Sequence, residues 1–427
     1  MNNTSNTSEL FSKYDVPVPR YTSYPTVPFW EKTPSKKEWT DSIRDTLDSD
    51  NSKWSLYIHL PFCESLCWFC GCTTVITKSH SQEDVYVNAI KKELSTYLKE
   101  VPELKTSDLV EIHFGGGTPT FFAPEKLDQF LSFLFENTKI NKKTFTGSIE
   151  IDPRVTKKEH LEVLAKYGFS RVSLGVQDFD PAVQKAVNRI QTFEKTKDVI
   201  DWSRDLGFKS VNVDLIYGLP LQTIDSISSS IEKTLTLRPE RIAFYAFAHL
   251  PWMKPAHGVF SEIPGGKEKR ELYEVGRDLL IKGGYDDIGM DHFALPADEL
   301  STARENKTLH RNFMGYTVQK SDLLIGIGMS SISESHGAYH QNEKNLSEYL
   351  KTVSENEIPT LRGHLLTKED SEQKEIILSL MTELKTLCNE GEFTDIQLDL
   401  INHLKEDGLI TISDNLIQIT DLGRAFL

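Results

Sequence analysis

Cysteine is scarce in this sequence outside one short stretch. Four of the five cysteines in 427 residues lie between Cys63 and Cys72, and the fifth, Cys388, is far downstream. An odd number of cysteines crowded at one place makes a poor disulfide framework. We therefore expect a reducing, cytoplasmic compartment in which these thiols act as ligands.

Long hydrophobic runs and an excess of positive charge are also lacking. No stretch approaches the roughly 18 apolar residues of a membrane-spanning helix, and the N-terminal residues contain no apolar core flanked by basic residues. Lysine and arginine number 48 against 63 aspartates and glutamates, which gives a net charge of −15. This balance argues against nucleic acid and an anionic membrane surface as partners.

Between residues 51 and 300, short β-rich runs alternate with segments of helical period. The runs are WSLYIH, VEIHF, GSIEI, RVSLGV, SVNVDLIYG, RIAFYAFAHL and DDIGMDHFAL. One connecting helix is marked by Tyr86, Ile90, Leu94 and Tyr97, which recur at three- and four-residue steps. The alternation predicts an α/β fold with a parallel sheet, arranged as a partial or complete β/α barrel.

Three further segments are expected around this barrel core. Residues 1–50 form an arm over the active site, because PRYTSYPTVPFW (19–30) is rich in proline and aromatic residues. Residues 301–360 form a barrel-closing segment, in which LLIGIGMSSIS (323–333) has the pattern of a buried strand and turn. Residues 361–427 form a small helical domain, with a wing-like hairpin made by LITISD and LIQITD.

The cysteines are spaced Cys63-x3-Cys67-x2-Cys70-x-Cys72. A structural zinc site normally takes two pairs of ligands from separate segments. Three thiolates at x3 and x2 spacing can instead hold three corners of a cubane iron–sulfur cluster and leave the fourth iron open to a ligand. Cys72 then stands near the site as a bystander. A zinc loop or buried free thiols is the alternative.

Two motifs together resemble a known superfamily. CxxxCxxC after a first strand, with FGGGTPT (114–120) after the second, is similar to the pattern of the radical S-adenosylmethionine (SAM) enzymes. We expect the glycines at 115–117 to let the backbone approach a ligand closely and to offer it N–H groups. Within the superfamily, the added x-Cys and the segments PRYTSYPT, EIDPR, GVQDFDPAVQKAVNRIQ, NVDLIYGLP and RNFMGYT resemble the oxygen-independent coproporphyrinogen III dehydrogenases of bacterial haem synthesis.

The resemblance implies a reaction and its cofactors. One [4Fe–4S] cluster and two SAM molecules are expected, with the methionine amine and carboxylate of the first SAM on the open iron. A 5′-deoxyadenosyl radical then takes a hydrogen from a substrate propionate, and loss of CO2 and one electron leaves a vinyl group. Two propionates of coproporphyrinogen III react in turn to give protoporphyrinogen IX. The expected partner is an electron donor such as a flavodoxin or ferredoxin, and the expected state is a monomer.

The resemblance also implies the site residues. The cluster ligands are Cys63, Cys67 and Cys70. The residues around SAM are Tyr57, Phe69, Gly116, Gly117, Thr118, Glu150, Gln177, Arg189, Asp214, Ala248 and Ile332. No catalytic residue is assigned, but Arg20 and Tyr21 in the arm are candidates to meet the substrate.

Several of these residues have ordinary structural alternatives. Glu150 and Asp214 could cap the helices that follow their strands, Arg189 could be a surface ion-pair partner, and Tyr57 could be core. Histidines 59, 113, 249, 257 and 292 suggest a metal site, although His59 and His113 are more typical of satisfied core histidines.

One departure and two alternative functions remain. Met314, in RNFMGYT, stands where the family commonly has glutamine, and a thioether cannot replace an amide that hydrogen-bonds a ligand. The second SAM is therefore less well supported than the first. Haem-chaperone-like relatives share this frame but typically lack the fourth cysteine and the arm. A zinc-stabilised scaffold without radical chemistry is the alternative from another class.

Overall fold

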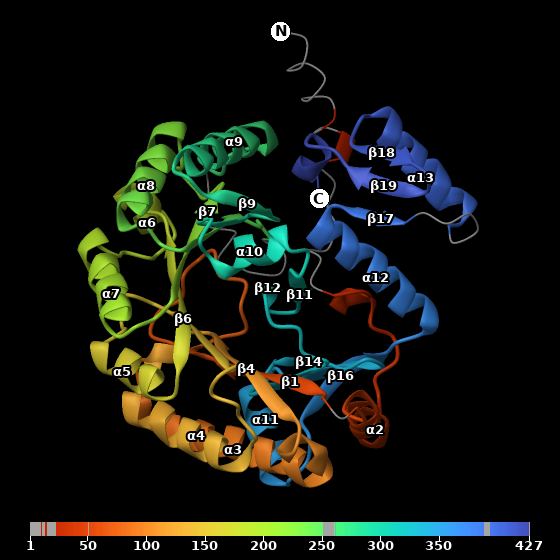
Figure 1. Ribbon diagram of the computed structural model, residues 1–427. Coiled ribbons are helices and arrows are strands. Elements are labelled where there is room, and N and C mark those ends of the chain that lie inside the picture. Colours follow the sequence, from red (N-terminus) through yellow and green to blue (C-terminus); the bar gives the residue numbers. More distant parts are fainter. Residues whose placement is uncertain are drawn as a thin grey trace.

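The computed structural model describes residues 10, 13–14, 23–49, 51–250, 260, 262–387 and 393–426. The predicted α/β class is confirmed. A twelve-stranded sheet with the order β16-β15-β14-β13-β1-β4-β5-β6-β7-β8-β10-β9 curves through the molecule, and helices cover its outer face (Figure 1).

The centre of the sheet is parallel, as the alternation of strands and helices predicts. Its strands are β1 (Lys53–Leu60), β4 (Asp108–Gly116), β5 (Thr146–Ile151), β6 (Phe169–Gln177), β7 (Ser210–Tyr217) and β8 (Arg241–Ala246). The connecting helices are α3 (Glu83–Glu100), α4 (Pro124–Asn137), α5 (Lys158–Lys166), α6 (Pro181–Ala186), α7 (Phe193–Asp205) and α8 (Ile224–Leu237), and α9 (Gly266–Lys282) follows β8.

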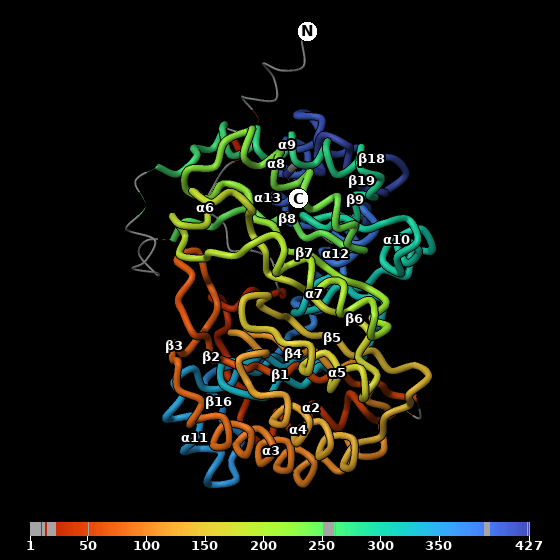
Figure 2. The backbone as a smooth tube through the Cα atoms, turned by 90° about the vertical axis from the view of Figure 1, so that its left-hand side faces the viewer, coloured from red at the N-terminus to blue at the C-terminus, as the bar shows by residue number. Residues whose placement is uncertain are grey.

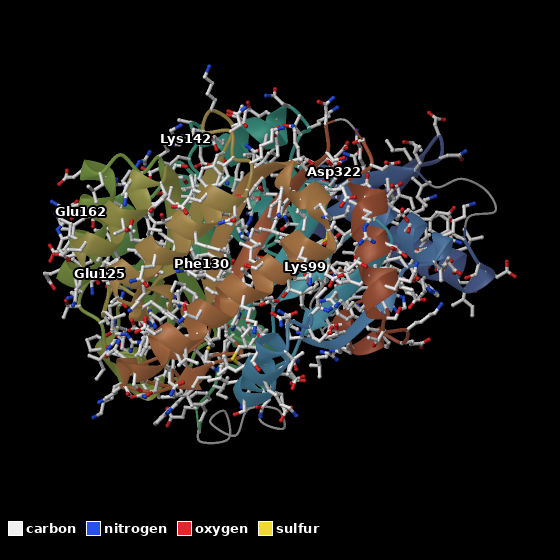
Figure 3. The ribbon with its side chains drawn as sticks, turned by 90° about the horizontal axis from the view of Figure 1, so that it is seen from below. Lys99, Glu125, Phe130, Lys142, Glu162 and Asp322 are labelled. Atoms are coloured by element: carbon white, nitrogen blue, oxygen red, sulfur yellow. The ribbon has the colours of Figure 1, made fainter. Side chains whose placement is uncertain are left out.

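Helix α3 shows why these connections form helices. Its predicted apolar face, Tyr86, Ile90, Leu94 and Tyr97, is buried almost completely, and it packs in the main core beneath the sheet. Figure 3 shows α3 and α4 side by side on this outer face, with Lys99 and Glu125 labelled on them. Apolar periodicity therefore fixes which side of each connecting helix meets the sheet.

The run DDIGMDHFAL was predicted as one strand, and this was wrong. It forms two antiparallel strands, β9 (Asp286–Gly289) and β10 (His292–Ala294), and β10 also pairs antiparallel with β8. Met290 and Asp291 have φ angles of 38° and 69°, the left-handed conformation of a two-residue hairpin turn. Because this turn reverses the chain, the parallel order ends at β8.

The other edge of the sheet continues from β1. Strand β13 (Leu323–Ile327) is fully buried and lies parallel to β1, which confirms the strand expected in LLIGIGMSSIS. Strands β14 (Ile332–Glu334), β15 (Ala338–Asn342) and β16 (Thr360–Leu365) follow in antiparallel order, with α11 (Leu346–Ser354) between the last two. In the described residues β16 and β9 end the sheet without pairing with each other, so the barrel is partial.

Smaller elements flank the sheet. Helix α10 (Glu299–Glu305) and the hairpin of β11 (His310–Asn312) and β12 (Gly315–Thr317) lie between β10 and β13. Near the N-terminus, α2 (Lys36–Thr46) begins at a capping box between Ser35 and Glu38. Within the described ranges, none of the helices combines the length and the apolar character needed to cross a bilayer.

The C-terminal elements gather beside the sheet (Figure 1). They are α12 (Lys368–Glu383), β17 (Lys385–Leu387), α13 (Asp395–Glu406), β18 (Ile410–Ser413) and β19 (Leu416–Ile419). Asp414 and Asn415 both have positive φ angles and form the tight turn between β18 and β19. The predicted helices and wing-like hairpin are confirmed, and β17 adds a third strand to the hairpin.

Candidate functional site

A cavity of about 380 Å³ lies inside the curve of the sheet, within the usual size of a ligand pocket. Alternate residues of a strand point to the same face. On β7, Ser210, Asn212 and Asp214 therefore line the cavity, whereas Val213 and Leu215 are fully buried on the other face. The inside of this barrel is consequently polar, as a binding site requires, and is not packed with apolar side chains.

The cysteine loop follows β1 and closes on itself. Strands β2 (Phe62–Cys63) and β3 (Val75–Ile76) pair at its two ends, and the N–H of Thr77 donates to the Cys63 carbonyl at 2.9 Å. Within the loop, the N–H of Cys70 donates to the Cys67 carbonyl at 3.0 Å and makes a tight turn. This folding brings Cys63, Cys67 and Cys70 to one end of the cavity, together with Cys72.

Two arginines contact the most buried cysteine sulfur. Arg189 Nη1 lies 3.4 Å, and Arg154 Nη2 lies 3.5 Å, from Cys67 Sγ. Asp152 forms ion pairs with both guanidinium groups. The Cys67 sulfur therefore lies beside a buried network of two cations and one carboxylate. The prediction did not include Asp152 and Arg154, although EIDPR directly after a strand was their signal.

The donor set fits a cluster better than a single ion. In the parts of the chain that the structure describes, no three His, Cys, Asp or Glu side chains are placed to hold one metal ion. Burial raises the pKa of the Cys63 thiol to about 11, so a thiolate there needs a cation at the sulfur. Three cysteines that line one end of this cavity suit an iron–sulfur cluster, which thiolates hold at separate corners.

The glycines of FGGGTPT pack two loops together. A Cβ at Gly117 would lie 2.5 Å from the Pro61 carbonyl oxygen, and one at Gly116 would lie 2.7 Å from the His59 ring. The N–H of Gly117 donates to the Leu60 carbonyl at 2.8 Å, and that of Thr118 to the Phe62 carbonyl at 3.0 Å. The expectation that the glycine N–H groups are offered to a ligand was therefore wrong for Gly117, whose N–H donates within the protein. Close contact with the cysteine loop is what requires glycine here.

Two carboxylates face the cavity from β5 and β7, the strands on either side of β6. Glu150 Oε1 lies 3.2 Å from His113 Nε2, and its Oε2 accepts from the Gly116 N–H at 3.3 Å. Burial opposes the charge on Glu150, but these hydrogen bonds outweigh it and lower the pKa of this carboxyl. For Asp214, burial and the charge of Glu150 raise the pKa to about 7, despite hydrogen bonds from Ser173 and Asn212.

These positions settle several of the structural alternatives. The helices that follow β5 and β7 have Lys157 and Thr223 as their N-caps, so Glu150 and Asp214 are not helix caps. Arg189 is only 7% exposed and is therefore no surface ion-pair partner. His59 and His113 are satisfied histidines as predicted: His59 Nε2 lies 2.9 Å from the Thr73 carbonyl oxygen, and His113 Nδ1 lies 2.7 Å from Ser148 Oγ.

Most of the expected SAM residues line the cavity, but some do not. Those that line it are Phe69, Gly116, Gly117, Thr118, Glu150, Gln177, Arg189 and Asp214. Tyr57 lies behind this layer, with its ring stacked on His113. Ala248 is exposed in the loop after β8, and Ile332 lies in β14, away from the lining. Arg20, Tyr21 and His257 fall outside the described residues.

Comparison with known proteins agrees with this geometry. The sequence pattern of the Radical SAM superfamily matches residues 57–233. Oxygen-independent coproporphyrinogen III oxidase of Helicobacter pylori (strain 26695) is 39% identical over 97% of this chain and 93% of that protein. The Pseudomonas aeruginosa enzyme of the same name is 36% identical over 98% of this chain and 93% of its own.

The solved structure of coproporphyrinogen III oxidase from Escherichia coli, described as a radical SAM enzyme, superposes with a TM-score of 0.89. The two sequences are 33% identical, and the superposition covers 95% of this chain and 96% of the Escherichia coli chain. The partial parallel barrel and its cysteine loop thus define a radical SAM protein, whose cofactors are a [4Fe–4S] cluster and SAM. Within that class, the chain belongs to the family of the oxygen-independent coproporphyrinogen III oxidases.

Proposed function

We propose that this protein oxidatively decarboxylates two propionate side chains of coproporphyrinogen III to vinyl groups without oxygen and so yields protoporphyrinogen IX. The observation that carries the proposal is the joining of the cysteine loop to a polar cavity inside the sheet. The relatives that match nearly the full length of the chain are named coproporphyrinogen III oxidases, and this supports the proposed substrate.

In the proposed site, Cys63, Cys67 and Cys70 hold the cluster. When bound, the cluster and SAM supply a 5′-deoxyadenosyl radical that removes a hydrogen atom from the propionate. Per propionate, CO2 leaves and one electron passes to an acceptor, so the carbon chain ends as a vinyl group. The protein positions the reactants and excludes water, and the cofactors carry the difficult chemistry.

The remaining residues would orient SAM. Asp214 and Glu150 face the cavity as acceptors for a ribose hydroxyl or the ammonium of methionine, and Arg189 is a donor for its carboxylate. Phe69, inside the cysteine loop, would pack against adenine. Behind them, Tyr57 supports His113 by ring stacking. Ala248 and Ile332 belong to the proposal by resemblance alone.

A second SAM molecule is part of the proposal, with Met314 beside it. Met314 lines the cavity. Its backbone N–H does not face the ligand, because it donates to Asn312 Oδ1 at 2.9 Å. A thioether would contact this SAM by packing only. Equilibrium dialysis with SAM at increasing concentration should show two SAM molecules bound per cluster. Met314→Gln should lower the Kd of the more weakly bound SAM.

The proposal also covers the setting of the reaction. We infer a cytoplasmic monomer, reduced by a flavodoxin or ferredoxin, because cluster thiols need a reducing compartment. We propose that the chain is divided into an arm (1–50), a barrel core (51–300), a closing segment (301–360) and a C-terminal domain (361–427). Arg20 and Tyr21 would act from the arm on substrate, and Arg20→Ala should raise KM for coproporphyrinogen III.

The deciding experiment is turnover after anaerobic reconstitution with iron and sulfide. Incubation with SAM, a reductant and coproporphyrinogen III should yield 5′-deoxyadenosine and the divinyl product together, and Cys67→Ser should abolish both. If deoxyadenosine forms while the porphyrinogen survives, the radical chemistry holds and the substrate is wrong. Retention of haem without turnover would instead identify a haem-binding relative.

A further inference from the structure

The cavity has a second end, opposite the cysteines. Arg171 lies near the start of β6, six residues before Gln177, so the two ends are about 20 Å apart at about 3.3 Å per residue. Arg241, at the start of β8, lines the same end. Figure 2 shows α10, which covers this end, on the side of the molecule opposite β2 and β3.

Helix α10 engages both arginines but leaves one nitrogen over. Arg241 Nε donates to Asp298 Oδ1 at 2.9 Å, and Arg171 Nη2 donates to Glu299 Oε2 at 2.8 Å. Among the residues that the structure describes, Arg241 Nη2 is buried without any hydrogen-bond partner. A buried donor left unsatisfied costs about 1–3 kcal/mol, and more when it is charged. The anchoring of α10 therefore accounts for the hydrogen bond of Arg241 Nε, but it gives no partner to the buried Nη2.

The acids around this end do not satisfy that nitrogen. Asp298 Oδ2 accepts a hydrogen bond from Ser210 Oγ at 3.0 Å, and Oδ1, which already accepts from Arg241, also accepts from the Leu300 N–H. The side chain of Glu299 is 58% exposed, so water screens its charge. Glu111 Oε1 lies 3.8 Å from Arg171, and its buried Oε2 has no partner among the described residues. This end of the cavity thus presents one cationic donor without a partner, Arg241 Nη2, and one acceptor without a partner, Glu111 Oε2.

We propose that Arg241 Nη2 binds the carboxylate of a propionate that the reaction leaves intact, with Glu111 Oε2 accepting from the pyrrole N–H of the macrocycle. This inference rests on the proposed function. Coproporphyrinogen III carries its two retained propionates on the edge opposite the two that react. With the reacting edge facing SAM on the cysteine-loop side of the cavity, the retained edge points towards β8 and α10. A guanidinium nitrogen is the donor that carboxylate geometry favours.

The test is binding of stable porphyrins to the reconstituted holoenzyme, followed by fluorescence quenching. Arg241→Lys keeps a cation for Asp298 but has no second nitrogen for the ligand. It should weaken coproporphyrin III at least about tenfold, the size of a charged hydrogen bond. Protoporphyrin IX keeps the same two propionates and should weaken by a similar factor, whereas coproporphyrin III tetramethyl ester should bind both proteins equally.

The matched control is Arg277→Lys, since Arg277 Nε donates to Asp287 Oδ2 at 3.0 Å in the same way but does not line the cavity. Equal affinity of wild type and Arg241→Lys for coproporphyrin III overturns the proposal. So does a loss confined to coproporphyrin III, which would place Arg241 against a reacting propionate. If wild type binds no porphyrin, the proposed function fails first.

A change to the ligand tests the same contact if Arg241→Lys does not fold. Coproporphyrin III amidated at its retained propionates should bind wild type at least about tenfold more weakly than the isomer amidated at the reacting ones. Equal binding of the two amides contradicts the subsite. SAM cleavage by wild type in the absence of porphyrin serves as the check that the holoenzyme is intact.

Discussion

Arg189 lies between Asp152 and the sulfur of the cysteine loop: its Nη1 is 3.1 Å from Asp152 Oδ2 and 3.4 Å from Cys67 Sγ. Burial opposes the charge on Asp152, but Arg189 and Arg154 overcome it and lower the pKa of this carboxyl. All three side chains therefore carry their charges beside a proposed cluster ligand. Such buried networks hold their geometry firmly, because removal of one member leaves an uncompensated charge.

The first prediction follows from the position of that guanidinium. Arg189→Gln should make the reduction potential of the reconstituted cluster more negative, because a nearby cation stabilises the added electron. A shift on the order of 50 mV corresponds to about tenfold for a one-electron couple. Redox titration followed by electron paramagnetic resonance measures it. Arg204→Gln, whose side chain pairs with Glu240 outside the cavity, is the control, and an equal potential in both variants would contradict the prediction.

The second prediction separates ligands from the bystander. Serine at Cys63, Cys67 or Cys70 should each abolish iron uptake, because a cluster with two protein sulfurs is poorly held. Serine at Cys72 should leave iron and sulfide near wild-type content. Iron analysis and absorbance of the anaerobically reconstituted proteins give the answer. Loss of iron from Cys72→Ser would show a fourth protein ligand and exclude an open iron.

The third prediction tests the packing of two loops. Gly117→Ala should destabilise the protein by about 1–3 kcal/mol, because its Cβ would lie 2.5 Å from the Pro61 carbonyl oxygen. Gly71→Ala is the matched control within the cysteine loop, since nothing lies within 4 Å of its Cβ. Urea unfolding of both variants measures the difference. A neutral Gly117→Ala would mean that the loops separate easily.

Sequence pattern predicted the fold where local periodicity decides the structure. The alternation of strands and helices and the buried face of α3 are set by residues close in the chain, and both are confirmed. The split of DDIGMDHFAL was missed because Met290 and Asp291 lack the glycine or asparagine that usually marks such a turn. Periodicity also carries no information about partners, so the pairing of β13 with β1 could not be read from it.

The parts of the candidate site that lie in sequence motifs could be predicted, whereas the contacts between residues on opposite sides of the barrel could not. The cysteines follow a recognisable strand and Asp214 lies within another, and they do line one cavity. Arg154, in the turn after β5, and Arg241, at the start of β8, are far apart in sequence, and the curvature of the sheet brings both to the cavity. Inward or outward orientation of a strand residue follows from register, which a single run of letters does not fix.

The fourth prediction concerns the charge of Asp214. Its pKa is raised to about 7 by burial and by Glu150, against a value of 3.8 for an ordinary aspartate. The folded protein therefore binds a proton that the unfolded chain has released, and Asp214 lowers the free energy of unfolding as pH rises from about 4 to 7. Asp214→Asn should remove this loss. Its stability relative to wild type should grow by on the order of 1–3 kcal/mol between about pH 5 and pH 8.

Urea unfolding of the cluster-free proteins at several pH values measures the effect, because bound SAM would add its own charge. Asp201→Asn is the control, since Asp201 is a surface residue paired with Lys197 and lies outside the cavity. Its difference from wild type should not change over the same range. A parallel pH dependence of wild type and Asp214→Asn would show that Asp214 is already ionised in the empty site, and the raised pKa would then be wrong.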